Sequence, residues 1–457
     1  MLFHENPSKA VQLSLEIFPM YRAKDRKTLP LFPELFPFGG KLNENNRWLR
    51  ISELIPWDDL EEDYAKKFSN MGRPAKDGQL VIGLMLLKHM TGLSDEGVVT
   101  TVQENPYMQA FCGFEKFVTD ELVDSSTLSR MRERLGLEFF KQLETKTYKL
   151  LIDRKIIRAK GMLIDATVFP ENIKYPNDVG LLNDVREWLV GNIKKFGKAI
   201  GKTYRTRPRV ARKEYLNYSK KKKKTKKTIN NAKKKMLQHV RRNLKQMKEV
   251  FEIVKAQGKR IKQNIIDRIE VAEKIYSQQQ EMYKAKVNRI ADRIVSFHRP
   301  YVRPIKRGKS GKPTEFGAKG ALSLVDGCLF LDHLEHAAFS EDKWTGTHIN
   351  AYREKFGKVP PYISADQKYG SRDNRKLLDK EEIRASLKPL GRKPKENRSD
   401  RWIKAKQKER NRIEGSFGHG KQHFGMDRVK YQGKDGSEMW TRCCLLAMNL
   451  QAAAKKA

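Results

Sequence analysis

A long stretch without proline most constrains what this chain can fold into. From residue 229 to residue 295 the sequence contains no proline and a single glycine, Gly258. Apolar residues, among them Ile261, Ile265 and Ile269, recur through this stretch at the spacing that places them on one face of a helix. We therefore expect long helices that pair along their apolar faces and form a short coiled coil.

The same region holds most of the positive charge of the chain. The 457 residues include 94 Lys and Arg against 55 Asp and Glu, a formal net charge of +39. Residues 180–312 supply about three quarters of this excess. A field this concentrated favours a polyanion, most simply nucleic acid, and an anionic membrane surface is the weaker alternative. No apolar run is long enough to span a bilayer, so we expect no membrane partner.

Strand patterns lie on both sides of the basic stretch. MLIDATVF is apolar and β-branched around one aspartate, Asp165. Beyond the basic stretch, EFGAKGALSLV and CLFLDHLEH flank Asp326-Gly327, a strong hairpin turn, and PPYISADQKY reads as a strand that ends at Asp366. The order is strand, helical insert, hairpin, helix, strand, helix, strand, helix. It predicts a mixed α/β sheet with three antiparallel strands and parallel additions.

The region before the first strand has a helical pattern. Short apolar blocks with capping signals at Ser94 and Asp124 resemble a helix-turn-helix bundle, although a packing domain without groove contacts fits equally well. We therefore divide the chain into an N-terminal arm, a helical DNA-binding or dimerisation domain, a sheet core in two pieces and a basic helical insertion. Their respective bounds are 1–54, 55–155, 156–180 with 300–457, and 181–299.

Three acids could share a metal ion in the sheet core. Asp165 would be costly inside an apolar strand unless it is paired or bound to a cation. If its strand lies beside the strand that ends at Asp366, the two carboxylates meet at one edge, and a helix across that edge can add Glu414. Three carboxylate ligands suit Mg²⁺ or Mn²⁺, and two such ions could activate an attacking oxygen and stabilise a leaving one.

Two cations flank the third acid. Arg410 and Lys421 share a helix face with Glu414 and could hold neighbouring phosphates. Each of these assignments has an ordinary alternative: a surface salt bridge for Arg410 and Glu414, a core ion pair for Asp165, and a turn role for Asp366. Four other acids rank lower because they fall in turns, polar helices or exposed alternation: Asp184, Asp326, Asp332 and Asp373.

These residues give the chain a recognisable resemblance. LIDATV, SADQKYGSRDNRKLL and RNRIEGSFGHGK resemble, in this order, the three acid-bearing blocks of bacterial insertion-sequence transposases of the DDE class. One branch of that class has the signature Tyr, two residues, Arg, three residues, Glu, six residues, Lys. Arg410, Glu414 and Lys421 match it, whereas Gln407 stands at the tyrosine position. Residues 72–135 also resemble the helical N-terminal domain common in these transposases.

The resemblance implies a fold, an activity and partners. The fold would be a ribonuclease-H-like core, interrupted by the basic helical insert and preceded by an all-α domain. Asp165, Asp366 and Glu414 would bind two Mg²⁺ or Mn²⁺ ions, cut the ends of an insertion sequence and transfer the freed 3′ hydroxyl to target DNA. The partners would be double-stranded DNA with terminal inverted repeats, target DNA and a second subunit, in a bacterial cytoplasm at the nucleoid.

Two other functions remain open from the sequence. A related metal-dependent nuclease would cut without joining, and an inactive descendant would only bind DNA. We also expect the lysine cluster of the insert to grip DNA or to orient a partner subunit, with a merely solvated basic face as the alternative. In addition to Arg410 and Lys421, the predicted DNA-binding residues are Lys220, Lys221, Lys222, Lys223, Lys224, Lys226, Lys227, Arg241 and Arg242.

Overall fold

The structure, a computed structural model, describes residues 41–69, 71–306, 314–337, 339–391 and 398–457. The predicted N-terminal arm therefore lies outside the described residues up to residue 40. The remainder of that arm contains helix α1 (Arg47–Ser52), whose Trp48 and Ile51 are buried.

Before the sheet, the regular elements of the described residues are all helices, as the pattern predicts. Ser94 and Asp124 cap two of these helices: each side chain accepts a hydrogen bond from a backbone N–H in the first turn, which confirms both predicted caps. The central helix, α3, is buried over nearly its whole length. The helices after α1 are α2 (Trp57–Ala65), α3 (Gly78–Thr91), α4 (Asp95–Glu104), α5 (Pro106–Phe111) and α6 (Ser125–Asp153).

The sheet is mixed, as predicted. Strand β1 (Met162–Pro170) pairs antiparallel with β3 (Thr314–Val325) and parallel with β5 (Tyr362–Ser364), and β6 (Arg384–Ala385) extends the sheet parallel to β5. On its other edge β3 pairs antiparallel with two strands, first with β2 (Arg303–Lys306) over residues 314–317 and then with β4 (Cys328–Glu335) over residues 319–325. Asp326 and Gly327 join β3 to β4 with φ angles of 49° and 85°, which confirms the predicted hairpin turn.

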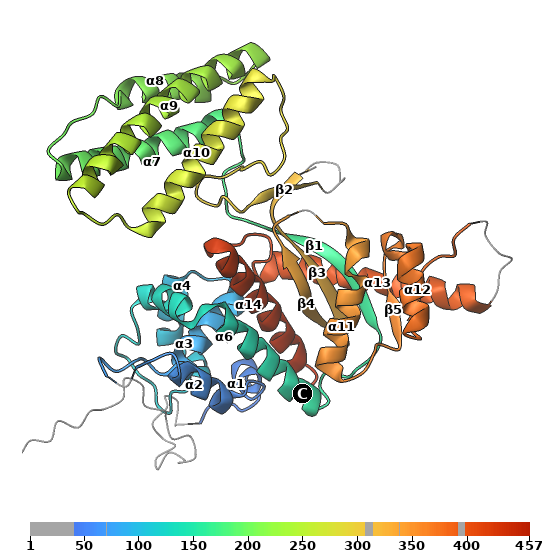
Figure 1. Ribbon diagram of the computed structural model, residues 1–457. Coiled ribbons are helices and arrows are strands. Elements are labelled where there is room, and N and C mark those ends of the chain that lie inside the picture. The colour runs from blue at the N-terminus through green and yellow to red at the C-terminus, as the bar shows by residue number, and fades with distance from the viewer. Residues whose placement is uncertain (1–40, 70, 307–313, 338, 392–397) are drawn as a thin grey trace, which may run out of the picture.

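Helices cover this sheet and join it to the N-terminal helices. Helix α14 lies between β4 and the helices α3 and α6 (Figure 1). One apolar core consequently extends from α1 through the sheet to α14, and the boundary predicted at residue 155 remains a prediction. The elements on the sheet are the 3-10 turns η2 (Glu341–Trp344) and η3 (Gln367–Tyr369), with α11 (Thr345–Phe356), α12 (Arg372–Lys380), α13 (Arg398–His423) and α14 (Gly433–Ala454).

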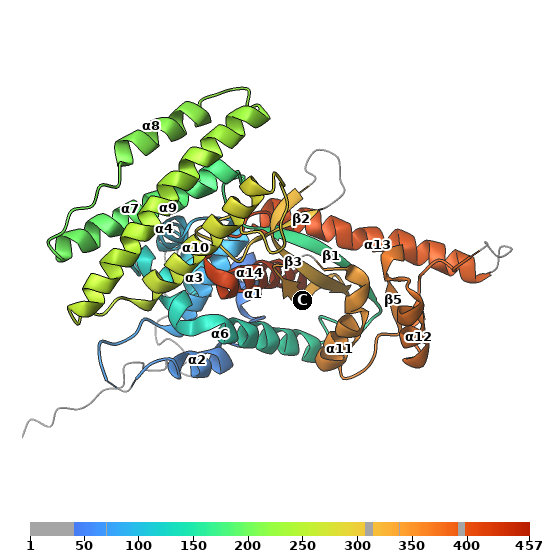
Figure 2. The same ribbon diagram turned by 45° about the horizontal axis from the view of Figure 1, so that its top comes forward.

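The basic insert is a four-helix bundle rather than a coiled-coil pair. Helix α9 (Lys226–Ala256) packs against α7 (Asp178–Ala199), α8 (Pro208–Ser219) and α10 (Gln263–Lys284). The bundle lies to one side of the sheet in both views (Figure 1, Figure 2) and has an apolar core of its own. The long paired helices predicted for residues 229–295 are present as α9 and α10, and α7 and α8 complete the bundle by packing against α9.

Ion pairs centred on two acids, Glu171 and Asp178, anchor this bundle. Glu171, directly after β1, pairs with Arg299 on the returning chain, and Arg299 also donates to the carbonyls of Val429 and Lys430. Within the bundle, Asp178 at the start of α7 pairs with Lys233 of α9 and with Arg293. Both ends of the insert are therefore fixed to the sheet and to each other.

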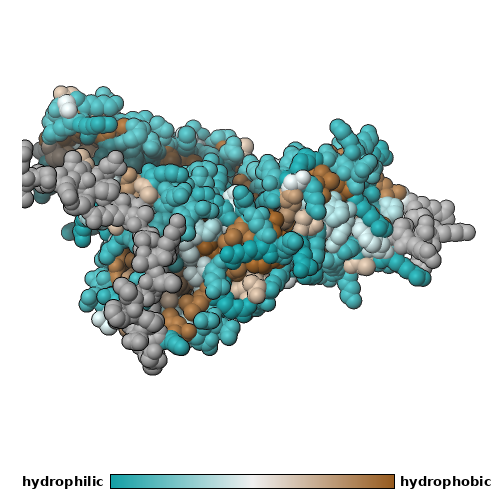
Figure 3. Space-filling model, turned by 90° about the horizontal axis from the view of Figure 1, so that it is seen from below, coloured by the Kyte–Doolittle hydropathy of each residue, from teal (hydrophilic) through white to brown (hydrophobic). Residues whose placement is uncertain are grey.

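Among the residues that the structure describes, none of the helices is both long and apolar enough to cross a bilayer. The face seen in Figure 3 is mostly hydrophilic, with hydrophobic residues gathered near its centre.

Candidate active site

Asp165 lies in the middle of β1 with only 16% of its side chain exposed. Its Oδ1 accepts a hydrogen bond from the Ala166 N–H at 2.8 Å, and its Oδ2 accepts one from Arg410 Nη1 at 3.1 Å. Burial raises the pKa of the Asp165 carboxyl to about 6, against the opposing effects of the Ala166 N–H and Arg410. The Ala166 N–H and Arg410 therefore only partly offset the free-energy cost of burying the ionised carboxylate.

Asp366 stands at the same level of the sheet as Asp165. The parallel pairing of β1 and β5 sets Leu163 opposite Ser364, and each acid comes two residues after this pair. The expectation that the two strands lie side by side is thus confirmed. Asp366 caps the turn η3, where its Oδ1 accepts from the Gln367 N–H at 2.5 Å.

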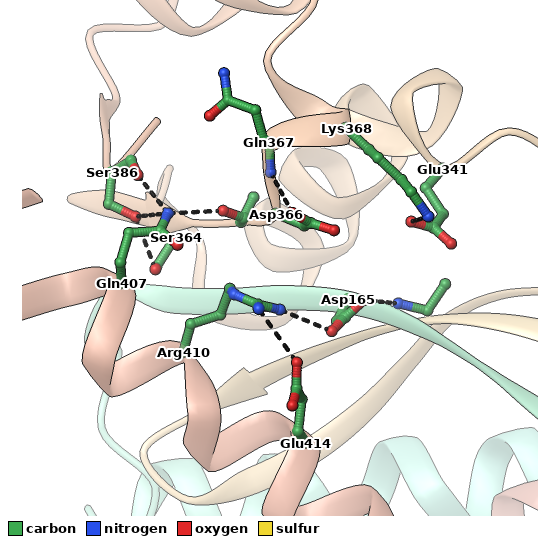
Figure 4. Close-up of polar contacts among 12 residues, drawn as sticks. Asp165, Glu341, Ser364, Asp366, Gln367, Lys368, Ser386, Gln407, Arg410 and Glu414 are labelled. Atoms are coloured by element: carbon green, nitrogen blue, oxygen red, sulfur yellow. Dashed lines mark hydrogen bonds and ion pairs between the residues drawn. The ribbon is translucent and has the colours of Figure 1, made fainter. Parts of the chain in front are cut away.

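Glu414 reaches the site from α13, which packs across β1 and β5. Its Oε1 accepts from Arg410 Nη2 at 3.1 Å, and 57% of its side chain is exposed. Arg410 therefore bridges Glu414 and Asp165 with the two arms of one guanidinium (Figure 4). The ion pair that the sequence offered as an ordinary alternative exists, and it belongs to the site.

One cavity of about 460 Å³ joins these residues. Asp165, Asp366 and Glu414 all line it, together with Arg410 and Lys421. Further charged residues in its wall are Lys306, Lys319, Lys368 and Glu341. The sheet and α13 thus bring together the five site residues that the sequence indicated in this part of the chain.

Sequence reasoning missed Glu341, a fourth carboxylate in this wall. It begins the turn η2, and its side chain is 11% exposed. Its carboxylate pairs with Lys319 Nζ at 2.9 Å and Lys368 Nζ at 3.7 Å. The charge of Glu341 also contributes to the raised pKa of Asp165. Glu341 lies between Ser340 and Asp342 in the polar segment SEDK, so no break in its pattern marked this residue.

Gln407 ties α13 to the ends of two parallel strands. Its Nε2 donates to the Ala365 carbonyl at 2.9 Å and to the Ser386 carbonyl at 2.5 Å. A second link comes from Ser364 Oγ, which donates to the Lys406 carbonyl at 2.9 Å. The residue at the tyrosine position of the signature therefore fixes the helix that carries Glu414.

Helix α13 continues without interruption through the glycines of EGSFGHG. A Cβ atom added at Gly415 or Gly418 would meet nothing within 4 Å, and Gly418 lines the cavity. Arg410, Glu414 and Lys421 accordingly remain on one continuous helix. The absent side chain at Gly418 leaves room in the wall beside Glu414.

The predicted DNA-binding residues of the insert do not line the cavity. Lys220 to Lys227 are exposed in and beside the turn between α8 and α9, and Lys224 Nζ donates back to the Lys221 carbonyl at 2.8 Å. Arg241 is exposed, whereas Arg242 is directed into the bundle and donates to the Thr206 carbonyl at 2.9 Å.

The carboxylates of the cavity are ligands of the chemical type that a hard divalent cation binds. Oxygen ligands of this type are those preferred by Mg²⁺ and Mn²⁺, and the raised pKa of Asp165 shows a carboxylate that would gain from a further positive charge. Within the described part of the chain, no three His, Cys, Asp or Glu side chains form a ready metal cluster. Arg410 instead spans Asp165 and Glu414, so metal binding would require this guanidinium to withdraw.

Comparisons with known proteins identify two regions of the chain. Residues 36–134 match the family described as a transposase domain, DUF772, and residues 363–451 match the family described as a transposase DDE domain. A Rhizobium meliloti protein described as "Uncharacterized protein ORF8 in nfe locus" is 33% identical over 166 residues, which cover 36% of this chain and 80% of that protein. No solved structure matches the chain. The second family region contains both Asp366 and Glu414.

Proposed function

The chain belongs to the DDE transposases of insertion sequences, and we propose that it cuts DNA at the ends of such an element and joins the freed 3′ hydroxyl to target DNA. We place it in the branch whose signature Arg410, Glu414 and Lys421 match, with Gln407 in place of the tyrosine. The core is proposed to have the ribonuclease-H-like arrangement that a DDE domain implies.

One observation carries this proposal. Asp165, Asp366 and Glu414 come from two strands and a helix far apart in the sequence, and all three line a single cavity. Arg410 and Lys421 line the same cavity. A wall of carboxylates flanked by cations suits a phosphodiester held against divalent metal.

Transposases of this class generally use divalent metals, and we propose that Asp165, Asp366 and Glu414 hold two Mg²⁺ or Mn²⁺ ions. Bound there, such ions would lower the pKa of an attacking water or 3′ hydroxyl and offset charge on the leaving oxygen. Strands β1 and β5 fix the two aspartates, whereas the more exposed Glu414 can turn on its helix.

The cations of the site have a different task. In the metal-free protein Arg410 neutralises Asp165 and Glu414. When these acids bind metal, the guanidinium is released to hold a phosphate beside the one that is cut, since its planar fork suits two phosphate oxygens. Lys421 lies about three turns beyond Arg410 along α13 on the same wall, where it would hold another phosphate of the same DNA.

The proposed partners are double-stranded DNA with terminal inverted repeats and target DNA. The helices α1 to α6 and the lysine-rich turn of the insert would bind the element ends, and a homodimer would pair two of them. The net charge of +39 supports a polyanionic partner.

A strand-transfer assay with DNA bearing the inverted repeats that flank its own gene tests the function. Asp165→Asn, Asp366→Asn and Glu414→Gln should each lower cleavage and joining about a thousandfold, because metal catalysis supplies several kcal/mol. Asp373→Asn, which alters an exposed acid on α12, is the matched control and should leave both steps unchanged.

The same assay separates the alternatives. Cleavage without a joined product would favour a nuclease, and DNA binding with neither product would favour an inactive descendant. Full activity of the Asp165→Asn variant would overturn the proposed site altogether.

A further inference from the structure

The catalytic cavity contains one carboxylate more than the proposed function uses. Glu341 comes from η2, after β4 and before α11, and is not part of the three acid-bearing blocks. Figure 4 shows the Asp165 carboxylate between those of Glu341 and Glu414. Glu341 therefore faces Asp165 from the side of the cavity opposite α13.

Folding alone gives little reason for this carboxylate. A nearly buried charge costs free energy unless it is paired, and a well-packed apolar residue commonly serves stability equally well. Glu341 is held by Lys319 and Lys368, and both lysines line the same cavity. Its ion pairs, which join η2 to β3 and η3, thus also face the reaction space.

The charges in the wall follow one pattern. Each of three carboxylates, Asp165, Glu341 and Glu414, contacts a cation of the same cavity. In the wall as a whole, the acids Asp165, Glu341, Asp366 and Glu414 stand against the bases Lys306, Lys319, Lys368, Arg410 and Lys421. The metal-free site is therefore nearly balanced, and it can accept divalent cations when the basic side chains turn to phosphate.

We propose that Glu341 is a fourth carboxylate of the divalent-metal site, acting with Asp165 on the side away from Glu414. Metal binding takes over the neutralisation of Glu341 and frees Lys319 and Lys368 to contact the phosphates of bound DNA. The inference rests on the proposed function, since it assumes that Asp165 binds metal.

Mn²⁺ binding to the full-length protein without DNA tests the proposal, with bound and free Mn²⁺ distinguished by electron paramagnetic resonance. Glu341→Gln keeps the size of the side chain and an oxygen that accepts from Lys319, but it removes the charge. We expect it to weaken Mn²⁺ binding about tenfold. Glu354→Gln, at an exposed position of α11, should bind Mn²⁺ like the wild type.

The outcomes separate this inference from the proposed function. If Asp165→Asn loses Mn²⁺ while Glu341→Gln keeps wild-type affinity, the role of Glu341 is wrong and the transposase site stands. If the wild type has no Mn²⁺ site that depends on Asp165, both ideas fail.

A second measurement uses only the wild-type chain, so it does not depend on how a variant folds. Fe²⁺ with ascorbate and peroxide cuts the backbone beside its own binding site. Cuts next to residue 341, as well as near residues 165 and 414, would support the proposal. Cuts near 165 and 414 with none near 341 would overturn it.

Discussion

At the scale of single residues, Arg410 balances the negative charge of two carboxylates in the site. Its guanidinium contacts Asp165 and Glu414 at 3.1 Å each, although the two acids come from β1 and α13. A fork with fixed geometry can serve two carboxylates at once, which a lysine does less well. In the metal-free protein, Arg410 thus holds Asp165 and Glu414 in position through ion pairs with both.

Asp165 should make the stability of the metal-free protein depend on pH. Its pKa is about 6 in the folded chain, above the ordinary value of 3.8. As pH rises from 4 to 6 the unfolded chain releases this proton first, so ionisation of Asp165 lowers the free energy of unfolding. The cost reaches about 2–3 kcal/mol at pH 7, since one pKa unit corresponds to about 1.4 kcal/mol.

Asp165→Asn removes this ionisation. Relative to that of the wild type, its free energy of unfolding should therefore increase by about 2 kcal/mol from pH 4 to pH 7, so the variant gains relative stability as pH rises. Urea unfolding of both chains at the two pH values, with chelator present, measures the difference. An equal difference at both pH values would show that the pKa of Asp165 is not raised.

The acids differ in how visible they are in the sequence. Asp165 interrupts an apolar strand and Asp366 ends one, so each breaks a pattern that can be read locally. Glu341 breaks no pattern, because its neighbours are also polar. It becomes part of the site only when η2 folds against Lys319 of β3, and that contact depends on tertiary structure.

Among the elements, α13 needs an accurate position because it carries Arg410, Glu414 and Lys421. Gln407 provides it by donating to the carbonyls of Ala365 and Ser386 at the ends of β5 and β6. A glutamine amide reaches these acceptors directly. The departure from the signature tyrosine therefore has a structural role of its own.

Gln407→Ala should lower the free energy of unfolding by about 1–3 kcal/mol, because it leaves two backbone carbonyls without this donor. It should also reduce strand transfer by displacing Glu414. Chemical denaturation and the joining assay measure the two effects, with Gln422→Ala, at an exposed position of the same helix, as control. Unchanged stability of the Gln407 variant would show that other contacts hold α13.

Local sequence signals predicted individual helices, strands and turns better than they predicted how these elements pack together. The hairpin at Asp326-Gly327 and the caps at Ser94 and Asp124 follow from short-range backbone preferences. The four-helix bundle does not, because helical periodicity shows that α7 has an apolar face without showing which helix covers it. Strand β2 was not identified separately, since it is short and contains Pro304 at a sheet edge.

In the described residues, a large apolar core and separate apolar clusters within the insert are combined with an uneven charge distribution. The larger core joins the N-terminal helices to the sheet and α14, whereas the insert has a separate core. The insert region also holds most of the net positive charge. The cavity of the proposed active site and the lysine-rich turn therefore belong to different parts of the molecule, and a long DNA could contact both.

Neutralising the lysine-rich turn should weaken DNA binding in a salt-dependent way. Lys221, Lys222 and Lys223 are exposed between α8 and α9, and each phosphate contact contributes about 0.9 to the slope of log affinity against log salt concentration. The triple Lys→Gln variant should therefore reduce the slope by about 2–3. Salt titrations of binding to end-bearing duplex DNA measure it.

A matched variant separates local contact from total charge. Lys255, Arg260 and Lys262 are exposed where α9 joins α10, and replacing them with Gln removes the same charge from the other end of α9. If the turn contacts DNA, this variant should leave the salt slope nearly unchanged. Side chains that do not contact phosphates displace no counterions from the DNA when the protein binds, so their removal does not alter the slope. Equal slopes in the two variants would mean that the turn is only a solvated basic surface.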